Sequence, residues 1–258
     1  MDWFGPLALL LVGASAGAIN AVAGGGSLLT LPLLVFLGLP ETVANATNRI
    51  GVLANSIGSA AAYQRTGHVP WGTVRLVLPA TLLGSALGAW IAARLPDAAF
   101  RPVIGAVLVA MAAMLAFRPA RWLTPAADAP APPAAATAIA FFAIGVYGGF
   151  IQAGIGFFLV AASVRVAGHD LVRANGVKVA LTLLLTVVAI LVFAVAGEIR
   201  WIEGALLAAG STAGGWIGAR TAVRRGAAWI RWVLVAAVLA SAFELLGIWR
   251  AIGRLLGL

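Results

Sequence analysis

The stretch AINAVAGGGSLLT, residues 18–30, sets the architecture of this chain, because three consecutive glycines interrupt an otherwise apolar run. Glycine permits backbone conformations that a continuous helix does not use. A second interruption, GGFIQAGIGFFLV, occupies residues 148–160. Each break precedes an apolar segment of about 12 residues, which as a helix rises only ~18 Å against a hydrocarbon core of about 30 Å. We therefore expect two half-helices, each beginning at a glycine break.

The two breaks belong to an internal duplication. A shift of 130 residues places the first half of the chain on the second without gaps over a long stretch. Glycine and alanine matches are common in such a sequence, so the matches of other residue types carry the argument. These are Asn45 with Asn175, Trp71 with Trp201, Arg94 with Arg224 and Arg101 with Arg231. We divide the chain into a first membrane repeat at residues 1–118, a Pro-rich linker at residues 119–133 and a second membrane repeat at residues 134–258.

The composition requires an exterior that faces lipid. Hydrophobic residues make up 62% of the chain and charged residues 10%, whereas a soluble domain has about 25% charged residues. Each repeat contains five apolar segments, at residues 5–23, 27–38, 43–64, 71–93 and 100–117, and at residues 134–153, 157–168, 171–196, 201–222 and 229–249. The sequence predicts an all-α integral membrane protein of two homologous repeats, with about 8–10 membrane segments including short broken or re-entrant half-helices.

The arginines favour repeats of opposite orientation. Arginine and lysine collect on the cytoplasmic side of membrane helices. If each repeat crosses the membrane an odd number of times, one side carries ten arginines and the other five; with four crossings per repeat the split is eight to seven. The clearer bias favours inverted repeats, with the ten-arginine side in the cytoplasm and both termini outside. The N-terminus lacks the basic stretch and cleavage site of a signal peptide, so we expect a multi-pass protein of the bacterial inner membrane with a retained first helix.

Several function classes are excluded or disfavoured. The net charge of +9 lies mostly in short gaps between apolar runs, which is typical of membrane flanks and not of nucleic-acid binding. The absence of cysteine excludes thiol catalysis and cysteine metal sites, and the two histidines form no ligand cluster. We find no nucleophile–base pair and no phosphate loop. We expect no enzyme, no cofactor and no metal.

The third apolar segment of each repeat contains one unusual cation. Arg49 and Lys178 are the basic residues that lie well inside apolar runs, and Lys178 is the only lysine of the chain. A charge inside a membrane is costly and indicates a functional site. Two alternatives to a functional site stay open. In the first, the long side chain of each cation extends to the membrane–water interface. In the second, Asn45 and Asn175 only join helices by hydrogen bonds.

The expected site lies between the repeats, near the middle of the membrane. Helix N-termini present free N–H groups and attract anions, and inverted repeats with broken helices place transport sites at their interface. The alternative is that the glycines only allow close packing, as we expect for Gly84, Gly88, Gly214 and Gly218. The candidate substrate-binding residues are Asn20, Gly24, Gly25, Gly26, Asn45, Thr47, Asn48, Arg49, Gln152, Gly154, Gly156, Asn175 and Lys178.

These motifs resemble a known family. The run from Gly13 to Ser27, the stretch from Leu39 to Arg49, and the later Gly67-His68-Val69 and Trp71 are similar to the sulfite exporter TauE/SafE family of membrane permeases. The second half is similar too, in residues 145–150, 154–156, 173–175 and Lys178. The resemblance implies secondary transport of sulfite, sulfonates or related organic anions. The family usually has lysine where this chain has Arg49, which keeps the charge but makes the donor forked.

Our interpretation is a secondary transporter that moves a small sulfur-containing anion by alternating access. Its partners are the anion and membrane lipid. Proton coupling stays open, with Glu244 in the last segment as a weaker relay candidate. The alternatives are a passive anion channel, a membrane-embedded enzyme, and an assembly factor without transport.

Overall fold

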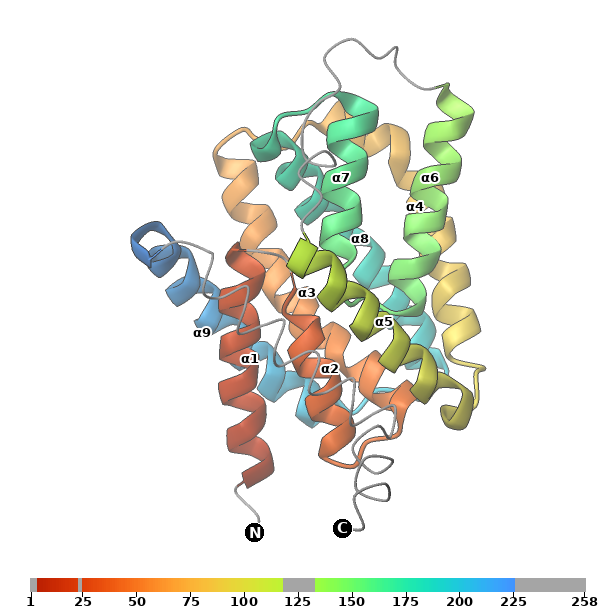
Figure 1. Ribbon diagram of the computed structural model, residues 1–258, viewed down its shortest axis with the longest axis vertical. Coiled ribbons are helices and arrows are strands. Elements are labelled where there is room, and N and C mark those ends of the chain that lie inside the picture. Colours follow the sequence, from red (N-terminus) through yellow and green to blue (C-terminus); the bar gives the residue numbers. More distant parts are fainter. Residues whose placement is uncertain (1–3, 23–24, 118–132, 226–258) are drawn as a thin grey trace.

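The computed structural model describes residues 4–22, 25–117 and 133–225, and this part of the chain is all-helical (Figure 1). Its nine helices are α1 (Phe4–Val22), α2 (Ser27–Phe36), α3 (Glu41–Arg65), α4 (Trp71–Ala92), α5 (Asp97–Phe117), α6 (Ala134–Phe150), α7 (Ile155–Ala167), α8 (Leu171–Val195) and α9 (Trp201–Arg225). The predicted helical class is confirmed. Gly24, nearly all of the predicted linker and the last predicted segment lie outside the described residues.

Glycines with positive φ end the helices at matching places in the two halves. Gly38 and Gly168, which are 130 residues apart, follow α2 and α7 with φ of 89° and 63°. Gly67 and Gly197 follow α3 and α8 with φ of 70° and 75°. Residues with a Cβ rarely adopt this left-handed conformation. The halves therefore share helix boundaries as well as sequence.

The second helix of each half is short, as predicted from the glycine breaks. Helix α2 has 10 residues and α7 has 13. Before α2, the Gly26 N–H donates to Asn20 Oδ1 at 2.8 Å, so the end of α1 holds the start of α2. Before α7, Gly154 has a φ of +75°. In both halves one helix therefore ends and the next begins inside the protein.

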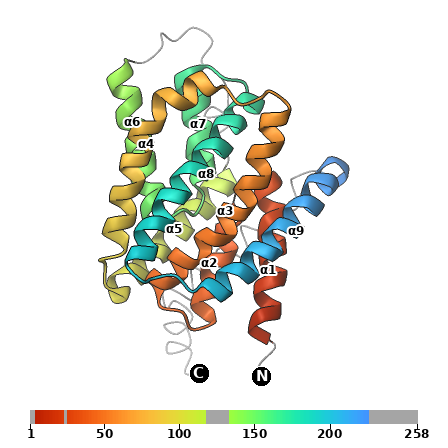
Figure 2. The same ribbon diagram turned by 180° about the vertical axis from the view of Figure 1, so that it is seen from behind.

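The two halves exchange partners. Helix α1 of the first half packs against α9 of the second, and α4 packs against α6. Helices α3 and α8 contact each other and hold equivalent places in the two halves. In Figures 1 and 2, α3 (orange) rises from the lower end to the upper end, and α8 (teal) descends. The long helices of one half therefore pack mainly against helices of the other half.

Glycines allow these helices to approach at backbone distance. A Cβ added at Gly88 of α4 would lie 2.0 Å from the Val146 carbonyl oxygen of α6, and one at Gly149 would lie 2.0 Å from the Ser85 carbonyl oxygen. On the other side, a Cβ at Gly214 of α9 would lie 1.7 Å from the Ala14 carbonyl oxygen. Close packing at Gly84, Gly88 and Gly214 is thus confirmed; the side-chain surroundings of Gly218 lie outside the described residues.

The exterior is apolar and the interior is partly polar. Helices α4 and α8 are long and apolar enough to cross a membrane by length and composition. Their outward side chains include Leu76 and Leu191, which are 69% and 61% exposed. In contrast, α3 buries a row of polar side chains, among them Asn45, Thr47, Asn48, Arg49 and Ser56. A soluble domain has the opposite distribution.

Replacing Gly88 by leucine tests the close helix contact. The added side chain meets the backbone of α6, so we expect overpacking of about 1–3 kcal/mol or more and a fall in the Tm of the detergent-solubilised protein. Gly72→Leu is the matched control, because it lies on the same helix and no atom lies within 4 Å of its added Cβ. Tryptophan fluorescence during heating measures both. Equal Tm values for the two variants would contradict the packing described.

Candidate functional site

A cavity of about 50 Å³ lies between the two halves. Its wall comes from α1, α2 and α3 of the first half and from α7, α8 and the α6–α7 connection of the second. The polar lining residues are Asn20, Ser27, Asn55, Ser56, Ser59, Gln152, Lys178 and Thr182. One water occupies roughly 10–15 Å³ on this measure, so the cavity has room for a few waters or a small ligand.

Lys178 brings the charge to this cavity. It lies on α8, is partly buried and lines the wall beside Thr182 and Val179. It makes no hydrogen bond or ion pair with any residue that the structure describes. No carboxylate lines the cavity among those residues. The ammonium group is therefore available to a ligand.

Both half-helices begin at the cavity. Ser27 is the first residue of α2, Ile155 is the first residue of α7, and both line the wall together with Gly156. The first N–H groups of a helix have no partner within it and carry partial positive charge. The wall therefore combines one cation with two helix N-termini, a combination that favours negative charge.

Asn20 and Gln152 stand before the two breaks and both line the cavity. Asn20 accepts from the Gly26 N–H, as described above. Gln152 donates through Nε2 to Thr186 Oγ1 and accepts at Oε1 from Arg49 Nη1 at 3.4 Å. The position of the Gln152 side chain is thus fixed from α3 and from α8.

Arg49 does not line the cavity. Its side chain is 0% exposed, and it donates to the carbonyl oxygens of Gly148 at 2.9 Å and Gly149 at 2.6 Å. Its guanidinium carbon lies 4.9 Å from the ring centroid of Phe193. The last carbonyls of a helix have no partner within it and carry partial negative charge. Arg49 therefore closes the C-terminal end of α6, and the alternative that it reaches the interface does not hold.

The two asparagines of the third segments differ. Asn45 donates through Nδ2 to the Phe150 carbonyl oxygen at 2.7 Å, so it joins α3 to α6 as one alternative proposed. Asn175 donates to the Leu171 carbonyl oxygen at 2.8 Å within its own helix. Among the described residues, the amide of Asn45 connects two helices, whereas the amide of Asn175 does not.

The other predicted residues surround the cavity or support it. Asn48 accepts from Thr30 Oγ1 and lines a smaller adjoining space of about 10 Å³ with Asn20 and Gly26. Thr47 accepts from the Arg200 N–H at 3.0 Å, which ties α3 to the start of α9. Gly25 is buried beside the break. A Cβ at Gly154 would lie 2.5 Å from Met111 Sδ of α5.

Sequence reasoning missed five polar lining residues: Ser27, Asn55, Ser56, Ser59 and Thr182. The signal that could have found them is spacing. Positions 48, 52, 55 and 59 lie four, three and four residues apart on one face of a helix, and 178 and 182 lie four apart. At that spacing, the polar residues Asn55, Ser59 and Thr182 continue the polar face that Asn48 and Lys178 begin.

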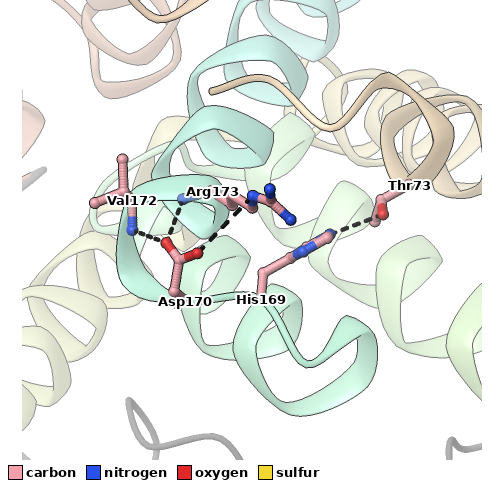
Figure 3. A network of polar contacts seen from close by, with 5 residues as sticks. All are labelled: Thr73, His169, Asp170, Val172 and Arg173. Carbon is pink, nitrogen blue, oxygen red and sulfur yellow. Dashed lines mark hydrogen bonds and ion pairs between the residues drawn. The ribbon is translucent and has the colours of Figure 1, made fainter. Parts of the chain in front are cut away.

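At one end of α8, a polar cluster joins the halves (Figure 3). Asp170 accepts from the Val172 and Arg173 N–H groups at 2.8 and 3.0 Å, so it caps the helix. The hydrogen bond from Arg173 holds the pKa of the exposed Asp170 carboxyl below its ordinary value. His169 Nε2 lies 2.8 Å from Thr73 Oγ1 of α4, and burial lowers the pKa of the imidazole. The cluster fixes the α7–α8 connection against the first half.

Comparison with known proteins covers nearly the whole chain. A model of the family described as sulfite exporter TauE/SafE matches residues 9–245. A probable membrane transporter protein, ORF9, of Sinorhizobium sp. is 30% identical over 244 residues, which cover 93% of this chain and 92% of that protein. A probable membrane transporter protein of Haemophilus influenzae is 26% identical, covering 88% of this chain and 89% of its own length.

A third relative is the probable membrane transporter protein YfcA of Escherichia coli. It is 26% identical over 244 residues, covering 90% of this chain and 87% of its own length. No solved structure matches this chain. The match over residues 9–245 confirms the resemblance that the glycine breaks and third segments carry. This chain belongs to the sulfite exporter TauE/SafE family of membrane transporters.

Proposed function

We propose that this chain is a secondary transporter of small sulfur-containing anions, such as sulfite, sulfonates or related organic anions, and a multi-pass protein of the bacterial inner membrane. The observation that carries the proposal is Lys178, which lines the cavity between the halves without a counter-ion among the described residues. A buried cation is stable beside an opposite charge and costly without one. An anion is therefore the ligand that this wall favours.

The neutral part of the wall suits an oxyanion. Hydroxyl groups of Ser27, Ser56 and Thr182 and the amide of Asn20 can donate hydrogen bonds. The starts of α2 and α7 add the partial positive charge of helix N-termini. Their N–H groups at Leu28, Leu29 and Ile155 already donate to carbonyl oxygens of the two breaks. Hydrogen bonds to a charged acceptor are about twice as strong as those between neutral groups. Sulfite and sulfonates present three oxygens in a pyramid, so donors from several helices can act together.

We also propose that the two halves are inverted repeats. Support comes from the exchange of partners, in which α1 packs on α9 as α6 packs on α4. The opposite directions of α3 and α8 in Figure 1 support it as well. Because the cavity draws its wall from both halves, rocking one half against the other would open it to each side in turn. Alternating access follows from that motion.

The distribution of arginine supports the same orientation. Arg65 ends α3, Arg75 lies in the first turns of α4, and Arg173 in the first turn of α8. These helix ends lie together at the upper end of Figure 1. Arg94 and Arg200 follow α4 and precede α9, at the opposite end. We place the upper end in the cytoplasm.

Removing the ammonium group tests the proposed site. Lys178→Ala should reduce sulfite flux into proteoliposomes by tenfold or more, because a hydrogen bond to a charged group contributes about 1.5–3 kcal/mol. Arg173→Ala is the matched control, since Arg173 lies on the same helix but is exposed, and its flux should stay close to that of the unchanged protein. Size-exclusion profiles confirm that both variants are folded.

The same assay separates the alternatives. Flux that saturates with sulfite concentration supports a transporter, and flux that rises without saturation indicates a channel. An assembly factor would produce no flux at all. Unchanged flux in Lys178→Ala would contradict the proposed site.

Cysteine labelling tests the inversion with two matched positions. Thr66 and Ala196 follow α3 and α8 at the same place in the two repeats, and both are exposed. In inverted repeats, Thr66→Cys should react with a membrane-impermeant maleimide only from the cytoplasmic side, and Ala196→Cys and Asp2→Cys only from outside. The chain has no cysteine of its own, so the labelling has no background. Reaction of both matched positions from one side would contradict inversion.

A further inference from the structure

We infer that Lys178 is also the group that couples anion movement to proton movement, taking up one proton when an anion enters the cavity and losing it when the anion leaves. This inference rests on the proposed function and deepens it. It assigns the coupling ion and the residue that carries it. The starting observation is that the cavity wall holds a single titratable side chain among the described residues.

The described groups that face Lys178 across the cavity are neutral. Helix α1 presents Asn20, α2 presents Ser27, α3 presents Asn55, Ser56 and Ser59, and α7 presents Ile155 and Gly156. The α6–α7 connection presents Gln152. Among the residues that the structure describes, no carboxylate lines the cavity, so none there can accept a proton from the ammonium group or balance its charge.

The other ionisable groups nearby are occupied or neutral. Arg49 reaches the wall only through Gln152, and its main bonds go to carbonyl oxygens of α6. Tyr147 donates to the Ala153 carbonyl oxygen at 2.5 Å. Tyr63 packs in an apolar cluster with Val177 and Leu181. Tyrosine is uncharged near neutral pH, so neither ring can serve as the counter-ion.

These surroundings link the charge of the amine to the presence of the anion. Burial without a counter-ion disfavours the charged form of an amine, and a neighbouring anion favours it. The empty cavity therefore stabilises the neutral amine more than the occupied cavity does. By linkage, anything that binds the charged form more tightly takes up protons as it binds.

The cycle balances in atoms and charge. On one side of the membrane, the neutral amine of Lys178 binds a proton from water and the ammonium binds one anion. On the other side the anion leaves and the ammonium releases the proton to water. No covalent bond to the anion forms or breaks. One proton moves with each anion in the same direction, and the step is electroneutral for a monovalent anion.

Calorimetry of the full-length protein in detergent measures this proton directly. The probe is thiosulfate, which carries no exchangeable proton near neutral pH. Titrations in buffers with different ionisation enthalpies give the number of protons taken up per bound anion. We expect that number to rise toward one as the pH increases, because a buried amine without a counter-ion loses its proton at a lower pH than an exposed lysine does.

Two variants test whether Lys178 is the group that takes up the proton. Lys178→Arg keeps a cation that does not titrate in this range, so anion binding that remains should proceed without proton uptake. Arg173→Gln, on the exposed first turn of the same helix, should retain the proton uptake of the unchanged protein. In proteoliposomes with a trapped pH dye, thiosulfate entry should acidify the lumen for the unchanged protein.

The outcomes distinguish this inference from the proposed function. Thiosulfate binding with no proton uptake at any pH would overturn the coupling inference and leave the transporter proposal standing. Equal proton uptake in Lys178→Arg would also overturn it, because another group would then carry the proton. If neither thiosulfate nor sulfite binds or crosses, both proposals fail. If Lys178→Arg does not fold, Lys178→Gln replaces it, and proton uptake with thiosulfate in that variant would overturn the inference in the same way.

Discussion

Helix α6 ends inside the protein, and Arg49 of α3 supplies the hydrogen bonds that the last carbonyls of α6 cannot make within the helix. Backbone polar groups at membrane depth must find partners in the protein, because lipid offers none. Asn45 adds a bond to Phe150 from the same face of α3. The break that creates the cavity is therefore stable because a buried polar helix of the opposite half closes it.

Because of this interaction, the two cations Arg49 and Lys178 have different surroundings. Arg49 has carbonyl oxygens and an aromatic ring around its guanidinium, so both of its terminal nitrogens are hydrogen-bonded within the protein. Lys178, at the equivalent region of the other half, has no such partners among the described residues. Of the two positive residues, one is held by hydrogen bonds within the protein, and the other lines the cavity. Gln152 lies between them, since it contacts Arg49 and also lines the cavity.

Most of the fold could be predicted because its signals are local. Apolar runs mark helices, prolines and glycines mark their ends, and the shift of 130 residues carries the pattern from one half to the other. The predicted ends of α3 and α8 lie within two residues of the observed helix ends. The short helices α2 and α7 were predicted from the length of the apolar segments that follow the two glycine breaks.

The roles of individual site residues could not be predicted in the same way, because they depend on contacts between distant parts of the chain. Arg49 and Lys178 look alike in sequence, since they lie four and three residues after the matched Asn45 and Asn175, near the start of an apolar segment. Only the packing of α3 against the end of α6 separates them. Ser56, Ser59 and Thr182 carried a helical spacing signal, but nothing local shows that α3 and α8 bring these residues to one cavity.

The most direct test of the central claim is whether a sulfur oxyanion binds at Lys178. Purified protein is heated with sulfite, thiosulfate, sulfoacetate or sulfolactate, and with chloride at equal ionic strength. A ligand at a hundred times its Kd stabilises by about 2.7 kcal/mol. We predict that at least one of these anions raises the Tm by several degrees, and that Lys178→Ala abolishes the shift. No shift with any anion, or an equal shift in Lys178→Ala, would contradict the account.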